Sequence, residues 1–454
     1  MSGALPPLGW TGIVRLGLVQ TALGAIIVLT TSTMNRVMVV ELALPAMLPG
    51  LLVALHHTVQ MLRPRMGYGS DVGGRRTPWI LGGMAVLALG GVLASLATAW
   101  MSQTTTGGIA LAIVAFLMIG IGVGAAGTSL LVLLAKRVDE RRRAAAASIV
   151  WAMMIAGFVV TAGVAGHFLD PYSPARLVLV TSVVAGAAFL LATVAVAGLE
   201  GRAPSPRSSS SSQRVAMPPF REALAQVWSE PQSRLFTIFV FVSMLAFSAQ
   251  DLILEPFAGT VFGLTPGQST QLSGVQNAGV LLGMVLVAFA CSARGRGRFG
   301  SVAAWRVGGC IASALALFGL ASAGFVGPDW PLKPSVFALG LANGAFAVAA
   351  IGSMMALAGT GRQSREGVRM GLWGAAQAVA FAAGGVVGTA AVDLMRWLVG
   401  SPLIAYATVF AAEAILFLIA AQLAAQVGRD APRTRQLRSD AVAVQRYVAE
   451  PGSP

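Results

Sequence analysis

The sequence predicts an all-α membrane protein with about twelve transmembrane helices in two pseudo-symmetric halves of six. Of its 454 residues, 56% are hydrophobic and only 11% are charged, a balance that no water-soluble domain of this length maintains. The chain also divides into about a dozen apolar stretches, each near the ~20 residues needed to cross a bilayer, with short polar breaks between them.

We expect spans at residues 12–34, 44–62, 79–100, 107–134, 144–168, 175–199, 235–260, 267–291, 302–324, 334–360, 370–395 and 402–427. The first is too long for a signal peptide and lacks a small-residue cleavage site, so we expect it in the mature protein. The Pro- and Ser-rich composition after the sixth span predicts a linker. The expected units are a half at 1–199, a cytoplasmic linker at 200–233, a half at 234–427 and a cytoplasmic tail at 428–454.

The basic residues predict the orientation of the chain. The net charge is +14, but only four of the 31 Lys and Arg residues lie on the side opposite the termini, namely Arg36, Arg176, Lys333 and Arg396. By the positive-inside rule, both termini are expected in the cytoplasm, in a bacterial inner or intracytoplasmic photosynthetic membrane. Anionic lipid head groups account for the basic loops, and no nucleic acid partner is expected.

The loop after the second span contains a glycine, aspartate and arginine pattern. It resembles the loop motif of the major facilitator superfamily, although Val72 stands where that motif has a basic residue. Glycines permit a tight turn, and an aspartate that caps a helix and pairs with arginine latches one conformation. The alternative is an ordinary basic loop. The candidate latch residues are Gly67, Asp71, Gly74, Arg75 and Arg76.

Polar residues within or beside the spans are candidate ligand-binding or gate residues, because such side chains are costly in a bilayer. The two halves echo one another: an amide beside a charge is followed by a carboxylate and a nearby proline, near the end of the first span and again in the seventh. The alternative is that these groups pair with each other or with water at the membrane interface. The candidates are Asn35, Arg36, Glu41, Gln250, Asp251, Glu255 and Gln377.

His56 and His57 lie in the middle of the second span. Imidazole is a common ligand of metals and of magnesium tetrapyrroles. Because adjacent helical residues point about 100° apart, at most one of the two faces a cavity; the alternative for each is a packing role. The two cysteines, Cys291 and Cys310, are not clustered, and the sequence contains no P-loop or Ser-His-Asp spacing. We therefore expect no enzyme activity, no metal site and no required cofactor.

Long strings in both halves resemble the PucC/LhaA family. They are the segments at 31–42, 63–71, 250–257, 343–355 and 371–378, and the resemblance extends from residue 9 to about 427. This family is the bacteriochlorophyll-delivery branch of the major facilitator superfamily. The short N-terminus and the Gly-Gly-Arg-Arg loop look closest to members encoded among late bacteriochlorophyll-synthesis genes.

The resemblance implies a carrier or assembly factor that binds bacteriochlorophyll, or a late precursor, and delivers it to light-harvesting apoproteins. In this role His56 or His57 is a candidate magnesium ligand. The candidate polar contacts or gate pairs are Asn35, Arg36, Glu41, Gln250, Asp251 and Glu255. Two alternatives stay open. One is a proton-coupled transporter of a small solute, with Asp251 or Glu255 as its protonating carboxylate. The other is a scaffold subunit that works with pigment-synthesis enzymes.

Overall fold

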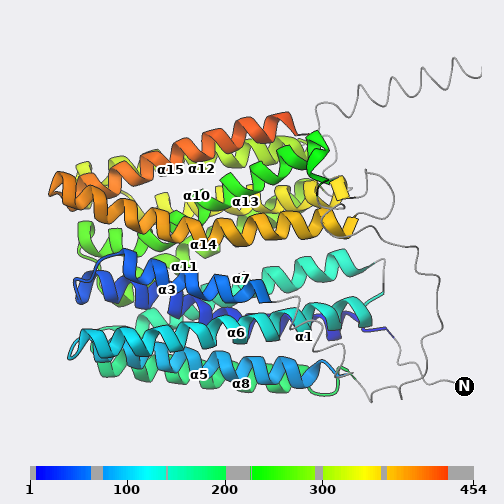
Figure 1. The fold of residues 1–454 in the computed structure, drawn as a ribbon, viewed down its shortest axis with the longest axis horizontal. Coiled ribbons are helices and arrows are strands. Elements are labelled where there is room, and N and C mark those ends of the chain that lie inside the picture. The colour runs from blue at the N-terminus through cyan, green and yellow to red at the C-terminus, as the bar shows by residue number, and fades with distance from the viewer. Residues whose placement is uncertain are drawn as a thin grey trace, which may run out of the picture.

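The computed structural model describes residues 7–62, 75–139, 142–200, 225, 227–291, 300–358 and 366–427, and within them the chain is helical and contains no strand (Figure 1). Eleven helices in this part are long and apolar enough to cross a membrane. The prediction of an all-helical membrane protein is confirmed.

The first half begins with one long helix interrupted by two π-helical segments. Its consecutive parts are α1 (Trp10–Val28), η1 (Leu29–Thr33), α2 (Met34–Arg36) and η2 (Val37–Glu41). The remaining helices of this half are α3 (Met47–Val59) with η3 (Gln60–Leu62), α5 (Thr77–Met101), α6 (Thr105–Arg137), α7 (Arg143–Leu169) and α8 (Pro174–Val196).

The second half contains six long helices. These are α10 (Pro231–Phe262), α11 (Pro266–Ala290), α12 (Val302–Val326) followed by the short η5 (Gly327–Asp329), α13 (Leu332–Ala358), α14 (Glu366–Val399) and α15 (Pro402–Gln426). Each half packs its own apolar core, one centred on α1, α5 and α6 and the other on α10, α12 and α15.

Most helix bounds lie within a few residues of the predicted spans, and two differences affect the site. The first helix continues to Glu41, so Asn35 and Arg36 lie inside it rather than beyond its end. The second expected span, at 44–62, is instead the 13-residue α3 followed by the 3-residue η3. Because the chain stays helical through Glu41 and Pro45 precedes α3, the second helix starts later than its hydropathy indicates.

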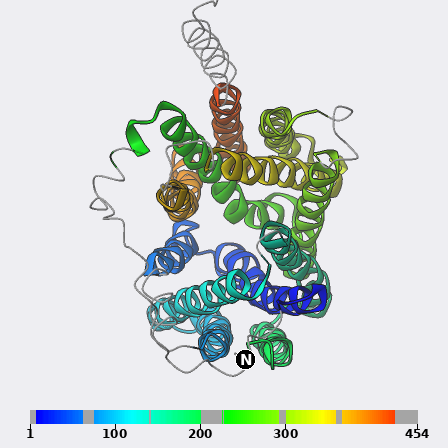
Figure 2. The same cartoon turned by 90° about the vertical axis from the view of Figure 1, so that its right-hand side faces the viewer.

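The two halves meet mainly through two helix pairs, α3 with α14 and α7 with α11, and η1, α2 and η2 add smaller contacts with α10 and α11. Figure 1 shows the start of α1 and the end of α15 at the same end of the molecule, which we call the terminal end; the opposite end is the distal end. Figure 2, viewed from the terminal end, shows the helices of the halves as two groups.

Glycines bring the helix pairs into backbone contact. A Cβ on Gly267 of α11 would overlap the carbonyl oxygen of Gly166 on α7, and a Cβ on Gly50 of α3 would overlap the Thr389 hydroxyl of α14. Small residues at such crossings allow helices in membranes to approach closely. This close approach aligns the polar groups at the distal end.

Candidate binding and gating site between the halves

Hydroxyl groups of η1 contact α11 across the boundary between the halves. The Ser32 and Ser273 hydroxyl oxygens lie 3.3 Å apart, and those of Thr33 and Thr270 lie 3.0 Å apart. All four residues are buried. Hydroxyl pairs of this kind are a common link between membrane helices, and each is worth about 0.6 kcal/mol on average in double-mutant cycles.

Asn35 satisfies a carbonyl group that a proline leaves free. Pro256 has no N–H, so the carbonyl of Leu252, four residues earlier in α10, lacks its helical donor. The Asn35 side-chain Nδ2 donates to that oxygen at 2.5 Å. Asn35, a candidate from the sequence analysis, therefore binds the backbone of the helix that carries the candidates Gln250, Asp251 and Glu255.

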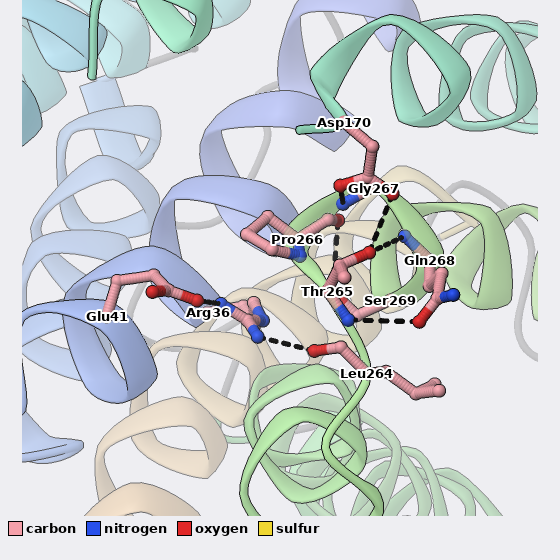
Figure 3. A network of polar contacts seen from close by, with 9 residues as sticks. All are labelled: Arg36, Glu41, Asp170, Leu264, Thr265, Pro266, Gly267, Gln268 and Ser269. Atoms are coloured by element: carbon pink, nitrogen blue, oxygen red, sulfur yellow. Dashed lines mark hydrogen bonds and ion pairs between the residues drawn. The ribbon is translucent and has the colours of Figure 1, made fainter. Parts of the chain in front are cut away.

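Arg36 links its own half to the other at the distal end (Figure 3). Its Nη1 forms an ion pair with Glu41, and its Nη2 donates to the carbonyl oxygen of Leu264 at 2.5 Å. Leu264 follows Gly263, which ends α10 in the left-handed conformation with φ of 67°. The Arg36 side chain is only 3% exposed, whereas that of Glu41 is 33% exposed.

Asp170, at the end of α7, caps the start of α11 in the other half (Figure 3). The Thr265 hydroxyl donates to Asp170 Oδ2 at 2.6 Å, and the Gly267 backbone N–H donates to Oδ1 at 3.1 Å. Thr265 also forms a capping box with Gln268. A carboxylate is favourable there because the first N–H groups of a helix lack intrahelical partners. The helix macrodipole also places a partial positive charge at this N-terminal end.

Asp393 of α14 makes the reciprocal contact. Its two carboxylate oxygens accept hydrogen bonds from the backbone N–H groups of Ala46, at 3.0 Å, and Met47, at 2.7 Å, at the start of α3. Each half therefore supplies a carboxylate that caps a helix of the other. The sequence analysis did not include either aspartate among the site residues. The available signal was that both stand near the ends of corresponding spans, the fifth and the eleventh.

A pocket opens beside these contacts at the distal surface, lined by Arg36, Glu41, Asp170 and Tyr172 among other residues. Tyr172 lies in the connection between α7 and α8. Its pKa is raised to about 12, first by burial and then by the negative charge of Glu41, with Arg36 opposing. The phenol therefore keeps its proton and acts as a neutral polar group in the pocket.

The acidic and amide residues of α10 are less well satisfied. Glu255 is 2% exposed, and neither of its carboxylate oxygens has a hydrogen-bond partner among the described residues. The same is true of both side-chain polar atoms of Gln250, which is fully buried. Asp251, one helical turn before Glu255, is half-buried. Of the predicted group, Gln377 lies apart, with its Nε2 3.9 Å from the Met244 sulfur within the second half.

The rings of the two histidines contact each other edge to face, with centroids 4.7 Å apart, but their other neighbours differ. His56 is buried, and its Nε2 lies 2.8 Å from the Gln60 amide nitrogen of the same helix. His57 is half-buried, and its ring centroid lies 5.4 Å from that of Phe381 on α14 in the other half. Of the pair, His57 is therefore the one at the boundary between the halves.

The latch prediction falls partly outside the described residues, which exclude Gly67, Asp71 and Gly74. Arg75 precedes α5, and the backbone N–H groups of Arg76 and Thr77 both donate to the Glu200 carboxylate. Burial raises the pKa of Glu200, but these hydrogen bonds outweigh it and leave the pKa below its ordinary value.

A second carboxylate at the terminal end, Glu230, binds Arg369 of α14 through hydrogen bonds of 2.7 and 3.0 Å. Both partners belong to the second half, and Arg369 is 1% exposed. The sequence analysis did not include Glu200 or Glu230 among the site residues.

This arrangement of helices is similar to that of solved membrane transporters. A mutant of the nucleoside transporter NupG matches with a TM-score of 0.67 at 12% identity, over 92% of this chain and 100% of that one. The peptide transporter POT in complex with sulfate matches with a TM-score of 0.67 at 14% identity, over 94% and 98%. At these identities the likeness establishes the fold alone.

The chain belongs to the PUCC protein family, whose model matches residues 33–431. The bacteriochlorophyll synthase 44.5 kDa chain of Rhodobacter capsulatus is 53% identical over 420 residues, covering 92% of this chain and 96% of that relative. Protein PucC of Cereibacter sphaeroides is 31% identical over 432 residues, covering 89% and 90%. The predicted family is confirmed, and one of these relatives is named for bacteriochlorophyll synthesis.

Proposed function

We propose that this protein is a membrane carrier or assembly factor that binds bacteriochlorophyll, or a late precursor of it, and passes it to light-harvesting apoproteins. The observation that carries the proposal is the combination of a two-halved transporter fold with a 53% identical relative named for bacteriochlorophyll synthesis. In a transporter of this kind the ligand binds between the halves, and their relative movement exposes it to one side at a time.

The proposed role is not enzymatic. One relative is named as a synthase chain, but membership of the PUCC family and a transporter-like fold favour a protein that handles pigment without transforming it. In this role the pigment is cargo, and no cofactor is required. A scaffold that supports pigment-synthesis enzymes is the alternative that the same relative favours.

We assign His57 as the candidate magnesium ligand in preference to His56. His57 lies at the boundary between the halves, with Phe381 of α14 beside it, whereas His56 is buried and engages Gln60. An imidazole binds magnesium through a ring nitrogen, and a neighbouring phenyl ring offers a flat apolar contact for a macrocycle. Asn35, Arg36 and Glu41 then serve as gate residues at the distal end.

The positive-inside asymmetry supports a cytoplasmic terminal end, with the protein in the inner or intracytoplasmic photosynthetic membrane. The distal gate would then face the periplasmic side. Pigment would enter from the synthesis enzymes or leave to the apoproteins. Either step would take place at the terminal side or laterally through the lipid.

A deletion strain complemented with wild-type protein or with His57→Ala tests the proposal. The matched control is His167→Ala, which changes an exposed histidine in the last turn of α7. We expect deletion to lower antenna absorption and the wild type to restore it. We also expect tetrapyrrole to purify with the wild type and the control in mild detergent, and a several-fold smaller amount with His57→Ala. Normal antenna levels together with no bound pigment would overturn the proposal. Accumulation of the unesterified precursor would favour the scaffold instead.

A further inference from the structure

Glu255 is a buried acid at the boundary between the halves, near the distal end. Neither of its carboxylate oxygens has a hydrogen-bond partner among the described residues. The groups that act on it are the charge of Arg36 from α2, the charge of Asp251 from α10 itself, and the hydroxyls of Ser32 from η1 and Ser269 from α11. The helices α14 and α15, which also pack against α10, contribute no charged group to it among the described residues.

Arg36 is the cation in this set, and its charge is already balanced. Its Nη1 is paired with Glu41 and its Nη2 is bound to the Leu264 carbonyl. The guanidinium lies against Gly259, one turn after Glu255, where an added Cβ would stand 3.0 Å from both Nε and Nη2. One arginine therefore faces two glutamates and is bonded to the more exposed one.

An ionised carboxylate with no cation bonded to it is strongly disfavoured in a buried site, and such a group takes up a proton instead. If the halves part at the distal end, α10 and α11 separate from η1 and α2, and water reaches Glu255. Water solvates the ionised form. The distally closed arrangement thus binds a proton at Glu255 more tightly than an open arrangement does.

We infer that Glu255 is a proton-binding site coupled to the distal gate: it holds a proton while the gate is closed and releases it to water of the distal pocket as the gate opens. By linkage, proton binding and closure favour each other reciprocally. Acid therefore favours the closed gate, and raising the pH favours opening. A single proton changes the ratio of open to closed molecules by at most about tenfold per pH unit. This inference does not depend on what the cargo is.

Spin labels on opposite halves of the distal surface report the gate in the full chain, reconstituted in lipid nanodiscs. Gln103, between α5 and α6, and Asp329, at the end of η5, are both exposed. They are replaced by cysteine in a background carrying Cys291→Ser and Cys310→Ala, the two native cysteines being free. We expect a short distance at pH 5 and a growing long-distance population toward pH 9.

The matched variants are Glu255→Gln and Glu413→Gln. Glu413 of α15 is also 2% exposed with both oxygens unpartnered among the described residues, but it lies in the core of the second half. We expect Glu255→Gln to stay closed across the pH range and Glu413→Gln to respond as the parent protein does. A parent protein that does not open with rising pH, or equal effects of both variants, would overturn the inference.

Glu41→Gln provides a second measurement that does not require the Glu255 variant to fold. Without Glu41, the charge of Arg36 is available to Glu255, so that Glu255 can ionise inside the closed gate. We expect the opening between pH 5 and 9 to shrink several-fold. An unchanged response would show that the charge of Arg36 does not determine the ionisation of Glu255, and would overturn the inference. Because bound pigment is not measured, failure here leaves the proposed carrier role separately testable.

Discussion

The distal and terminal ends of the molecule use their charged side chains differently. At the distal end Arg36, Asp170 and Asp393 all bond across the boundary between the halves. At the terminal end the carboxylates of Glu200 and Glu230 bond within their own halves. Polar contacts therefore join the two halves at the distal end, whereas the contacts of Glu200 and Glu230 at the terminal end stabilise each half by itself.

This difference indicates which bonds must break if the distal end opens. Opening the distal end costs the two reciprocal aspartate caps and the arginine contact, whereas the pairs of Glu200 and Glu230 can persist as each half moves as a rigid body. Variants at the distal end should therefore change the balance between conformations. Variants at the terminal end should change the stability of a half.

The largest effect on the closure of the distal end is expected from Gly267→Val, which places a side chain between α11 and α7. Its Cβ would overlap the Gly166 carbonyl and the Asp170 carboxylate, so the closed arrangement loses the close helix contact and is destabilised by about 1–3 kcal/mol or more. The Gln103 to Asp329 distance should lengthen at every pH. Gly163→Ala, at a position of α7 with open space around it, is the control. An unchanged distance in Gly267→Val would contradict distal closure through this pair.

The next effect is expected from Asp170→Asn and Asp393→Asn. Each removes the charge from a carboxylate that accepts two hydrogen bonds across the boundary, an effect of about 1.5–3 kcal/mol per charged hydrogen-bond acceptor at most. Both variants should increase the long-distance population, and the double variant should increase it further. If only one variant increases the long-distance population, the two aspartate caps do not contribute equally to the stability of the closed arrangement.

Glu230→Gln should lower stability without opening the gate. Arg369 is buried and keeps its charge, but Glu230 is 31% exposed, so water offsets part of the loss and we expect about 1 kcal/mol. A fluorescence melt in detergent should show a lower midpoint, while the Gln103 to Asp329 distance stays that of the parent protein. A change in that distance would remove the distinction between the two ends.

The sequence predicts much of the distal site but not how it is assembled. Polar residues within or beside the predicted spans identified Asn35, Arg36 and Glu255, and Pro256 implies a carbonyl without a helical donor. The partner of that carbonyl depends on how the halves pack, as do the Asp170 and Asp393 contacts, which join residues 95 and 347 positions apart. Hydropathy treats a carboxylate at the end of a span as an interface residue, so their capping roles stayed hidden.

The smallest effect is expected from the pH dependence of Glu200. Burial alone would raise its pKa, but the hydrogen bonds from Thr77 and Arg76 outweigh burial and lower the pKa in the folded protein. The resulting stability is present above the pKa of the unfolded chain and is lost as the pH falls through the lowered, folded pKa. Glu200 is only half-buried, so water offsets part of the loss and the effect is small.

Comparing melting midpoints of the parent protein and Glu200→Gln from pH 7 down to pH 3 isolates this contribution. The difference between the two proteins should be greatest at pH 7 and should narrow toward pH 3. The distal distance should show no difference between them at any pH, because Glu200 bonds only within its half in the contacts described. A Glu200→Gln variant that opens the distal gate would mean that the terminal contacts also hold the halves in position.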